Sequence, residues 1–126
     1  MEPLKIEKTQ VTPQVEFNED EGFFSISGRS FPEDAVKFYK PVLEWFRAYS
    51  DNPRPLTVLN FELEYFNTAS SKIIFEMIHI LKVMETDGHK VTVKWGYLEE
   101  DEGTLEAGEE YASLIKVPFV FSTYLG

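Results

Sequence analysis

The sequence predicts an α/β fold in which a mixed sheet of five or six strands carries helices chiefly on one face. Residues 59–65 and 91–97 alternate apolar and polar side chains, as half-buried strands do. Between them, residues 70–87 repeat apolar side chains at helical spacing. A strand, a helix and a second strand in this order, with a crossover of this length, predict a βαβ unit and hence two parallel strands.

The N-terminal part of the chain predicts a β-hairpin. Val15 and Phe17 alternate with polar neighbours, and Phe24 and Ile26 do the same after the acidic stretch 18–22, which ends in a glycine. Two short alternating runs separated by a turn of this kind are typical of paired antiparallel strands.

A first amphipathic helix is expected after this hairpin. The stretch 30–33, Ser-Phe-Pro-Glu, has the spacing of a capping box with a proline near the helix start. Pro41 falls inside the pattern and is expected either to kink the helix or to restart it, because it lacks a backbone donor. The apolar stripe consists of Ala35, Tyr39, Val42, Phe46 and Tyr49.

The second helix has a long apolar stripe and a defined end. Gly88 is placed to terminate it. In the flanking strands Tyr65 is expected to face inward with the other apolar residues, whereas Glu64 and Lys94 are expected to be cross-strand neighbours on the polar face. The stripe consists of Ile74, Met77, Ile78, Leu81 and Met84.

The C-terminal part predicts one more helix and one more strand. Residues 99–102 form an acidic loop, residues 104–115 a short helix and residues 119–121 a final short strand. Together with the preceding elements, these make a single domain over residues 1–126.

Composition and charge restrict the classes of partner. Lys and Arg total 12 against 22 Asp and Glu, so the formal net charge is −10. Such a surface repels nucleic-acid phosphates and anionic lipids, so neither nucleic acid nor membrane insertion is expected. With no cysteine and no apolar run long enough to span a membrane, the sequence predicts a cytoplasmic protein.

Catalytic and metal-binding motifs find no support in the sequence. The two histidines, His79 and His89, have no neighbour that suggests a catalytic or metal pair, and no glycine-rich phosphate loop is present. The acidic stretches 18–22 and 99–110 lack the ligand spacing of an EF-hand and are interpreted as solvated. We therefore expect no catalytic residue, no metal and no cofactor.

One enzymatic alternative stays open. Glu62 or Glu64 would serve as a base together with Ser70 or Ser71 in a small hydrolase or isomerase. Against it, the glutamates alternate along a strand as an ordinary solvated face would. A pocket that holds both groups would support this alternative.

The segment 65–72, Tyr-Phe-Asn-Thr-Ala-Ser-Ser-Lys, lies where a strand ends and a helix begins. Helix capping by Asn67 or Thr68 explains part of it. Yet one helix needs one cap, and Lys72 opposes the helix dipole in the first turn. A phosphate on a hydroxyl at this helix start would meet free amides, the positive dipole end and Lys72 together. The segment is therefore interpreted either as a helix cap alone or as a phosphorylation site.

Several stretches resemble the SiaC family of bacterial regulatory phosphoproteins. They follow one another in family order over nearly the whole chain, and together they are hard to assemble by chance. The stretches are 9–15, 26–33, 38–45, 65–72 and 93–97 with its acidic continuation.

The resemblance implies a fold similar to STAS domains and a phosphorylation site at Thr68. Ala69 stands where a serine is common in the family, which leaves Thr68 untouched. We take the partner-binding segment to be Asn67, Thr68, Ala69, Ser70, Ser71 and Lys72.

The resemblance also implies a set of partners. A cognate serine/threonine protein kinase (SiaB type) phosphorylates the protein, and a PP2C-type phosphatase (SiaA type) removes the phosphate. The unphosphorylated form binds and activates a diguanylate cyclase (SiaD type), and this controls cyclic di-GMP, aggregation and biofilm formation. An anti-sigma-factor antagonist with the same fold and switch is the alternative, and an unregulated scaffold is a second one.

Overall fold

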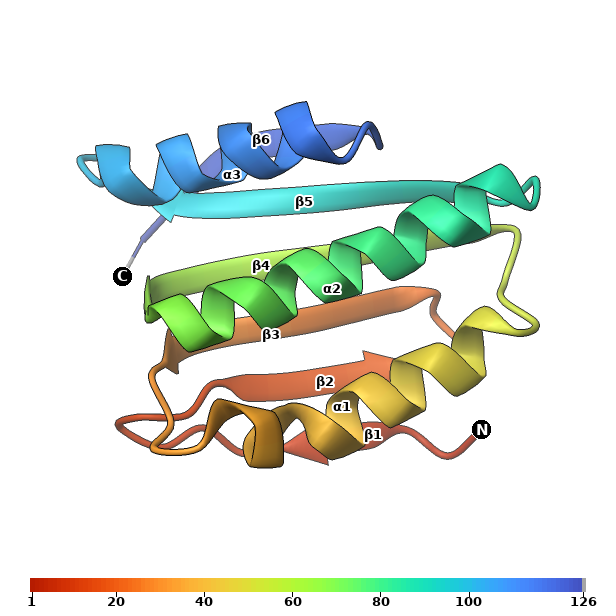
Figure 1. The fold of residues 1–126 in the computed structure, drawn as a ribbon, viewed down its shortest axis with the longest axis horizontal. Helices are drawn as coiled ribbons and strands as arrows, with labels where there is room; N and C mark the ends of the chain where they lie inside the picture. The colour runs from red at the N-terminus through yellow and green to blue at the C-terminus, as the bar shows by residue number, and fades with distance from the viewer. Residues whose placement is uncertain (126) are drawn as a thin grey trace.

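The computed structural model describes residues 1–125, which form one six-stranded sheet with three helices on one of its faces (Figure 1). The strands lie in sequence order, with β1, β2 and β3 antiparallel and β3 to β6 parallel. The predicted fold class is confirmed. The elements are β1 (Leu4–Ile6), β2 (Gln14–Asn18), β3 (Phe23–Ser30), α1 (Ala35–Ser50), β4 (Leu56–Phe66), α2 (Thr68–Thr86), β5 (Lys90–Leu98), α3 (Glu102–Leu114) and β6 (Phe119–Tyr124).

All three helices begin at the same end of the sheet. Because β3, β4 and β5 are parallel, their carboxyl ends lie together, and α1, α2 and α3 each start from that end (Figure 1). Each helix is capped by the side chain before its first residue, namely Asp34, Asn67 and Asp101. The segment 67–72 therefore lies on the end of the sheet where the helix amides point outward.

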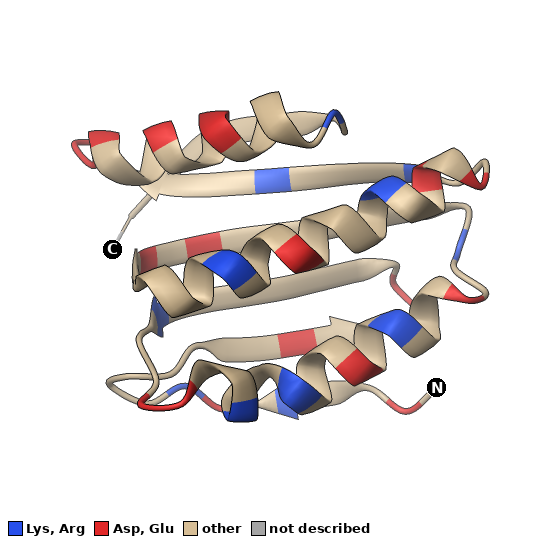
Figure 2. Ribbon diagram, in the orientation of Figure 1, with Lys and Arg blue, Asp and Glu red and all other residues tan. Residues whose placement is uncertain are grey.

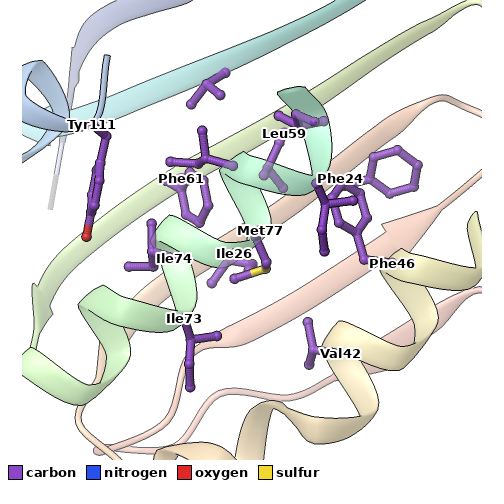
Figure 3. Packing of buried hydrophobic residues seen from close by; sticks show 14 of the residues in the cluster. Phe24, Ile26, Val42, Phe46, Leu59, Phe61, Ile73, Ile74, Met77 and Tyr111 are labelled. Carbon is purple, nitrogen blue, oxygen red and sulfur yellow. The ribbon is translucent and has the colours of Figure 1, made fainter. Parts of the chain in front are cut away.

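The core lies between the helices and one face of the sheet (Figure 3). Leu59, Phe61 and Leu63 alternate inward along β4, and Ile74 and Met77 meet them from α2. All five side chains are at most 1% exposed. Burying a side chain of this kind contributes about 1.5–3 kcal/mol, so the alternating pattern fixes which face of β4 the helices cover.

Helix α3 approaches the sheet closely because Gly108 has no side chain. A β-carbon at this position would lie 2.4 Å from Trp95 Cδ1, which no real contact tolerates. The Trp95 indole Nε1 also donates a hydrogen bond of 2.8 Å to the Thr104 carbonyl oxygen. Trp95 on β5 is thus the anchor of α3.

The capping-box prediction for the first helix was wrong. Asp34, not Ser30, caps α1, and its carboxylate accepts from the Lys37 amide at 3.1 Å. Ser30 is instead the buried last residue of β3. Helix α1 runs through Pro41 as one helix, so the chain does not restart there.

Two predictions about β4 were also wrong. Tyr65 is 53% exposed and contacts Phe31, because the strand pattern breaks at its last residues. Lys94 lies opposite Asn60, so Glu64 is not its neighbour. Glu64 pairs with Arg29 at 3.3 Å instead.

The remaining differences concern element ends. Helix α2 begins at Thr68, two residues before the expected start, and α3 covers Glu102–Leu114. The last strand extends to Tyr124, and β1 was not predicted. The helix end at Gly88 is confirmed, since its φ of 99° suits glycine.

Candidate functional site

The segment between β4 and α2 forms a tight helix start with Thr68 as its first residue. Asn67 caps the helix, and its side-chain Oδ1 accepts a hydrogen bond of 2.9 Å from the Ser70 amide. Capping therefore needs Asn67 alone among the polar side chains of this segment.

Ser70 belongs to a buried chain of hydroxyl groups that joins three elements. The Tyr39 hydroxyl lies 2.5 Å from Ser30 Oγ, which donates to Ser70 Oγ at 2.8 Å. Ser70 Oγ in turn donates to the Ser30 carbonyl oxygen at 3.0 Å. Because Ser30 uses its proton toward Ser70, Tyr39 must donate to Ser30. This chain fastens the first turn of α2 to β3 and to α1.

Tyr39 can act as this donor at any ordinary pH. Its side chain is fully buried, and burial raises the pKa of Tyr39 to about 12, although the hydrogen bond with Ser30 opposes the shift. The phenol thus stays protonated, and the chain of hydroxyls keeps its direction.

Ser71 fastens the same turn to α3. Its hydroxyl lies 2.5 Å from the Tyr111 hydroxyl, and Tyr111 donates to the Ser71 carbonyl oxygen at 2.9 Å. Burial raises the pKa of Tyr111, so it remains a donor. The hydroxyls of Ser70 and Ser71 therefore both have structural partners. Helix capping did not account for these two hydroxyls, and their hydrogen bonds to Ser30 and Tyr111 do.

Thr68 is the hydroxyl of this segment without such a partner. The side chain is exposed, and its Oγ makes no hydrogen bond to another group within residues 1–125. Ala69 beside it is also exposed. Lys72, one turn later, is exposed and has no carboxylate within 4.0 Å in the same part of the chain.

The start of α2 differs in charge from the starts of the other two helices. Asp34 and Asp101 place a carboxylate at the starts of α1 and α3, and Glu102 adds another in the first turn of α3. Helix α2 has the neutral cap Asn67 and no acidic residue in its first turn. Its dipole is therefore not compensated by the chain, and an added anion would be favoured there.

Two grooves flank α2, and Lys72 lines both. The first lies between α1 and α2 and has a volume of about 460 Å³; the second, of about 300 Å³, lies between α2 and α3. The first is lined by Val36, Lys40, Leu43, Glu44, Arg47, Lys72, Ile73 and Glu76. The second is lined by Ser71, Lys72, Phe75, Ala107, Glu110, Tyr111 and Leu114.

The structure does not bring together the residues of the hydrolase or isomerase alternative, in which a glutamate of β4 acts with Ser70 or Ser71. Glu62 alternates with the core residues of β4 and so lies on the open face of the sheet, where the Asn60 amide approaches it at 3.4 Å. Ser70 is buried on the helix side. The sheet separates the two groups, and Glu64 is paired with Arg29.

Residues 1–125 contain neither a cluster of metal ligands nor a membrane-spanning helix. Within residues 1–125, no group of three or more His, Asp or Glu side chains is arranged to hold a metal ion. In the same range no helix is long and apolar enough to cross a membrane. His79 is exposed, and His89 Nδ1 lies 3.3 Å from the Met84 carbonyl oxygen at the end of α2.

Comparison with known proteins gives consistent matches over nearly the whole chain. The model of the family described as SiaC family regulatory phosphoprotein matches residues 6–124. An uncharacterized protein of Pseudomonas aeruginosa (strain UCBPP-PA14) is 30% identical over 125 residues, which is 98% of each chain.

Solved structures agree with this match. The crystal structure of apo-SiaC from Pseudomonas aeruginosa has a TM-score of 0.90 and 26% identity, with 97% of this chain and 99% of that chain covered. A chain in the crystal structure of the diguanylate cyclase SiaD in complex with its activator SiaC, also from Pseudomonas aeruginosa, gives the same TM-score and identity, with 96% of this chain and 99% of that chain covered.

The fold and these matches define a small bacterial-type α/β protein of the regulatory phosphoprotein class. The chain belongs to the SiaC family. The resemblance that the sequence suggested is thereby confirmed.

The structure brings all six residues of the predicted segment 67–72 together at one helix start, but with unequal exposure. Thr68, Ala69 and Lys72 face solvent, whereas Ser70 is buried. Sequence reasoning missed Tyr39 and Tyr111, which hold the segment in place. Their apolar spacing marks them as core residues, and nothing in the pattern reveals their hydroxyl partners.

Proposed function

We propose that this protein is a non-catalytic phospho-switch whose state is set at Thr68. The unphosphorylated form binds and activates a diguanylate cyclase, and phosphorylation of Thr68 by a cognate serine/threonine kinase blocks this binding. A PP2C-type phosphatase restores the active form. The observation that carries the proposal is the exposed Thr68 hydroxyl at a helix start whose dipole no acidic side chain compensates.

Access and chemistry both favour Thr68 over its neighbours. A kinase needs a hydroxyl that can enter its active site, and Ser70 is fully buried while Ser71 is tied to Tyr111. A phosphate on Thr68 would lie near the free amides of α2 and near Lys72, which both stabilise an anion. Modification at Thr68 leaves the hydrogen bonds of Ser70 and Ser71 intact.

The effect on binding follows from charge. Phosphorylation adds about −1.5 to −2 charges and a tetrahedral group at the exposed edge of α2. If a partner covers this edge, the doubly charged phosphate would be desolvated with no cation from the partner and only Lys72 of this chain beside it, at a cost of several kcal/mol. A loss of that size abolishes a micromolar complex.

The choice of partner rests on similarity. The related SiaC of Pseudomonas aeruginosa is an activator found in complex with the diguanylate cyclase SiaD. We extend this to the present chain, together with kinase and phosphatase partners of the SiaB and SiaA types and a role in cyclic di-GMP signalling, aggregation and biofilm formation. The proposed setting is the cytoplasm, where a kinase has ATP.

The test combines phosphosite mapping with binding. After incubation with the cognate kinase, mass spectrometry is expected to find one phosphate, on Thr68. Thr68→Ala should bind the cyclase and resist the kinase, Thr68→Glu should bind weakly, and Thr68→Ser is the matched control that remains a substrate. Unchanged cyclase affinity in Thr68→Glu and in the phosphorylated protein would refute the switch.

A further inference from the structure

The groove between α1 and α2 has the chemistry of a helix-docking site. We propose that it receives an acidic amphipathic helix of the diguanylate cyclase and that Lys72 forms an ion pair with a carboxylate of that helix. When Thr68 is phosphorylated, Lys72 pairs with the phosphate instead. This inference rests on the proposed function and adds the place where the partner docks and the residue that the phosphate and the partner share.

The groove offers an apolar floor that the fold leaves uncovered. Val36, Leu43 and Ile73 line it, and Val36 is 75% exposed although it is a large apolar side chain on the first turn of α1. Two adjacent helices form a trough of this shape, and the apolar stripe of a third helix fills such a trough.

The charges around the groove favour an acidic partner. Arg47 and Glu76 neutralise each other at 3.0 Å. Lys40 and Lys72 have no carboxylate within 4.0 Å in residues 1–125, so with Glu44 the lining keeps an excess of positive charge. This excess stands out in a chain of net charge −10 (Figure 2).

The groove on the other side of α2 lacks this excess of positive charge. Helix α3, which forms its other side, carries four glutamates and no lysine or arginine, and Figure 2 shows this helix with red but no blue segments. Only Glu110 among them lines the groove, where Lys72 balances its charge. An acidic helix would gain no net attraction from this lining and would lie beside the negative charge of α3, so the α1–α2 groove suits it better. The four residues are Glu102, Glu106, Glu109 and Glu110.

Lys72 connects the groove to the modified hydroxyl. It lies four residues after Thr68, and residues at this spacing face the same side of a helix. The ammonium group on its flexible stem can therefore reach either a phosphate on Thr68 or a carboxylate in the groove, but one cation cannot fully serve both. Phosphorylation would thus remove a docking contact in addition to adding charge.

The experiment measures the affinity of the purified full chain for the cognate diguanylate cyclase by titration calorimetry. Val36→Asp tests the α1–α2 groove, and Leu114→Asp, at a residue that is 61% exposed, tests the α2–α3 groove. Lys72→Gln tests the shared cation, and Lys94→Gln, on the open face of the sheet, is the matched charge control. Each is measured without phosphate and with phosphothreonine incorporated at position 68.

The expected results are specific to the groove. Val36→Asp should weaken binding at least about 30-fold, because a carboxylate would be buried against the partner's apolar stripe. Lys72→Gln should weaken binding of the unphosphorylated protein by about tenfold and reduce the further loss on phosphorylation. Leu114→Asp and Lys94→Gln should bind as the unmodified sequence does.

Two outcomes would overturn the inference. If Leu114→Asp abolishes binding while Val36→Asp does not, the partner occupies the other groove. If Lys72→Gln leaves both affinities unchanged, Lys72 is not shared. Failure of the proposed function looks different: the phosphorylated and unphosphorylated forms of the unsubstituted protein would then bind equally, whatever the groove variants do.

Discussion

The Ser70 hydroxyl donates a hydrogen bond of 3.0 Å to the carbonyl oxygen of Ser30, a residue forty positions earlier in the chain. The same carbonyl accepts the Asn67 amide at 3.0 Å. These two bonds to one carbonyl, together with the bond from Ser30 Oγ to Ser70 Oγ, fasten the start of α2 to the last residue of β3. Thr68 lies between Asn67 and Ser70, the two residues that donate to the Ser30 carbonyl. Its position is therefore fixed by contacts in which its own side chain takes no part.

Ser70→Ala is expected to lower the free energy of unfolding by about 1–3 kcal/mol, because the buried Ser30 hydroxyl loses its acceptor. Urea unfolding followed by circular dichroism measures this difference. Ser113→Ala, on the exposed side of α3, is the matched control and should change stability by less than about 0.5 kcal/mol. Equal effects in both variants would show that the Ser30–Ser70 pair does not stabilise the fold.

Tyr39→Phe should change how stability depends on alkaline pH. The folded protein holds the Tyr39 proton to a pKa of about 12, whereas in the unfolded chain a tyrosine has its ordinary pKa of about 10. As pH rises past 10 the unfolded chain releases this proton first, so the free energy of unfolding falls toward pH 12. The fall should be shallower in Tyr39→Phe, by up to about 1.4 kcal/mol per pH unit.

Urea titrations at several pH values from 9 upward, roughly one unit apart, would measure that slope. Tyr65→Phe, which removes an exposed hydroxyl, is the matched control and should follow the unsubstituted protein. The raised pKa values of Tyr111 and Tyr124 act in all three proteins and cancel in the comparison. Parallel curves for Tyr39→Phe and the unsubstituted protein would contradict the assignment.

Gly108→Ala is expected to destabilise the fold by about 1–3 kcal/mol, since the added carbon meets the Trp95 ring and α3 must move. This loss occurs although alanine favours a helix over glycine by about 0.5–1 kcal/mol. Gly103→Ala is the matched control in the same helix. Its β-carbon meets nothing closer than 3.6 Å, so this variant should be neutral or slightly more stable.

Near-ultraviolet circular dichroism would report the position of α3 in these glycine variants, because Trp95 contacts both Gly108 and Tyr111. We expect a changed aromatic signal in Gly108→Ala and an unchanged one in Gly103→Ala. An unaltered signal with full stability in Gly108→Ala would mean that the close approach of α3 is not needed.

A phosphate on Thr68 is expected to stabilise the isolated protein by about 0.3–1 kcal/mol at low ionic strength, because it compensates the dipole of α2. Thermal unfolding with and without the phosphate measures the gain, which salt should reduce. Asn67→Asp, which puts a carboxylate on the cap, should give part of the same gain without phosphate. A lower stability of the phosphorylated protein would indicate a clash at the helix start instead.

The sequence predicted those parts of the fold that depend on local periodicity. The alternation along β4 and the stripe of α2 identified the parallel pair, and the end of α2 at Gly88 was recognisable from one residue. Strand β1 was missed because three residues are too few for a pattern. The capping box at Ser30 was misread because Asp34 offers an equally good cap four residues later.

The candidate site was predictable in place but not in detail. Polar residues at a strand–helix junction indicated the segment 67–72, and the resemblance to the SiaC family indicated Thr68 within it. Which hydroxyls are structural depends on Tyr39 and Tyr111, whose partners are reached only through the folded sheet. The closeness of Gly108 to Trp95 is likewise a tertiary distance that no spacing along the chain encodes.

The neutral cap of α2 has a consequence for the timing of the proposed switch. The Asn67 side chain holds the helix start by accepting a hydrogen bond from the Ser70 amide, so phosphorylating the neighbouring Thr68 hydroxyl breaks no hydrogen bond of the fold and demands no refolding. The protein can then pass between its two states as often as the enzymes act on it. Their turnover, and not any rearrangement of the backbone, would set how quickly a cell changes its response.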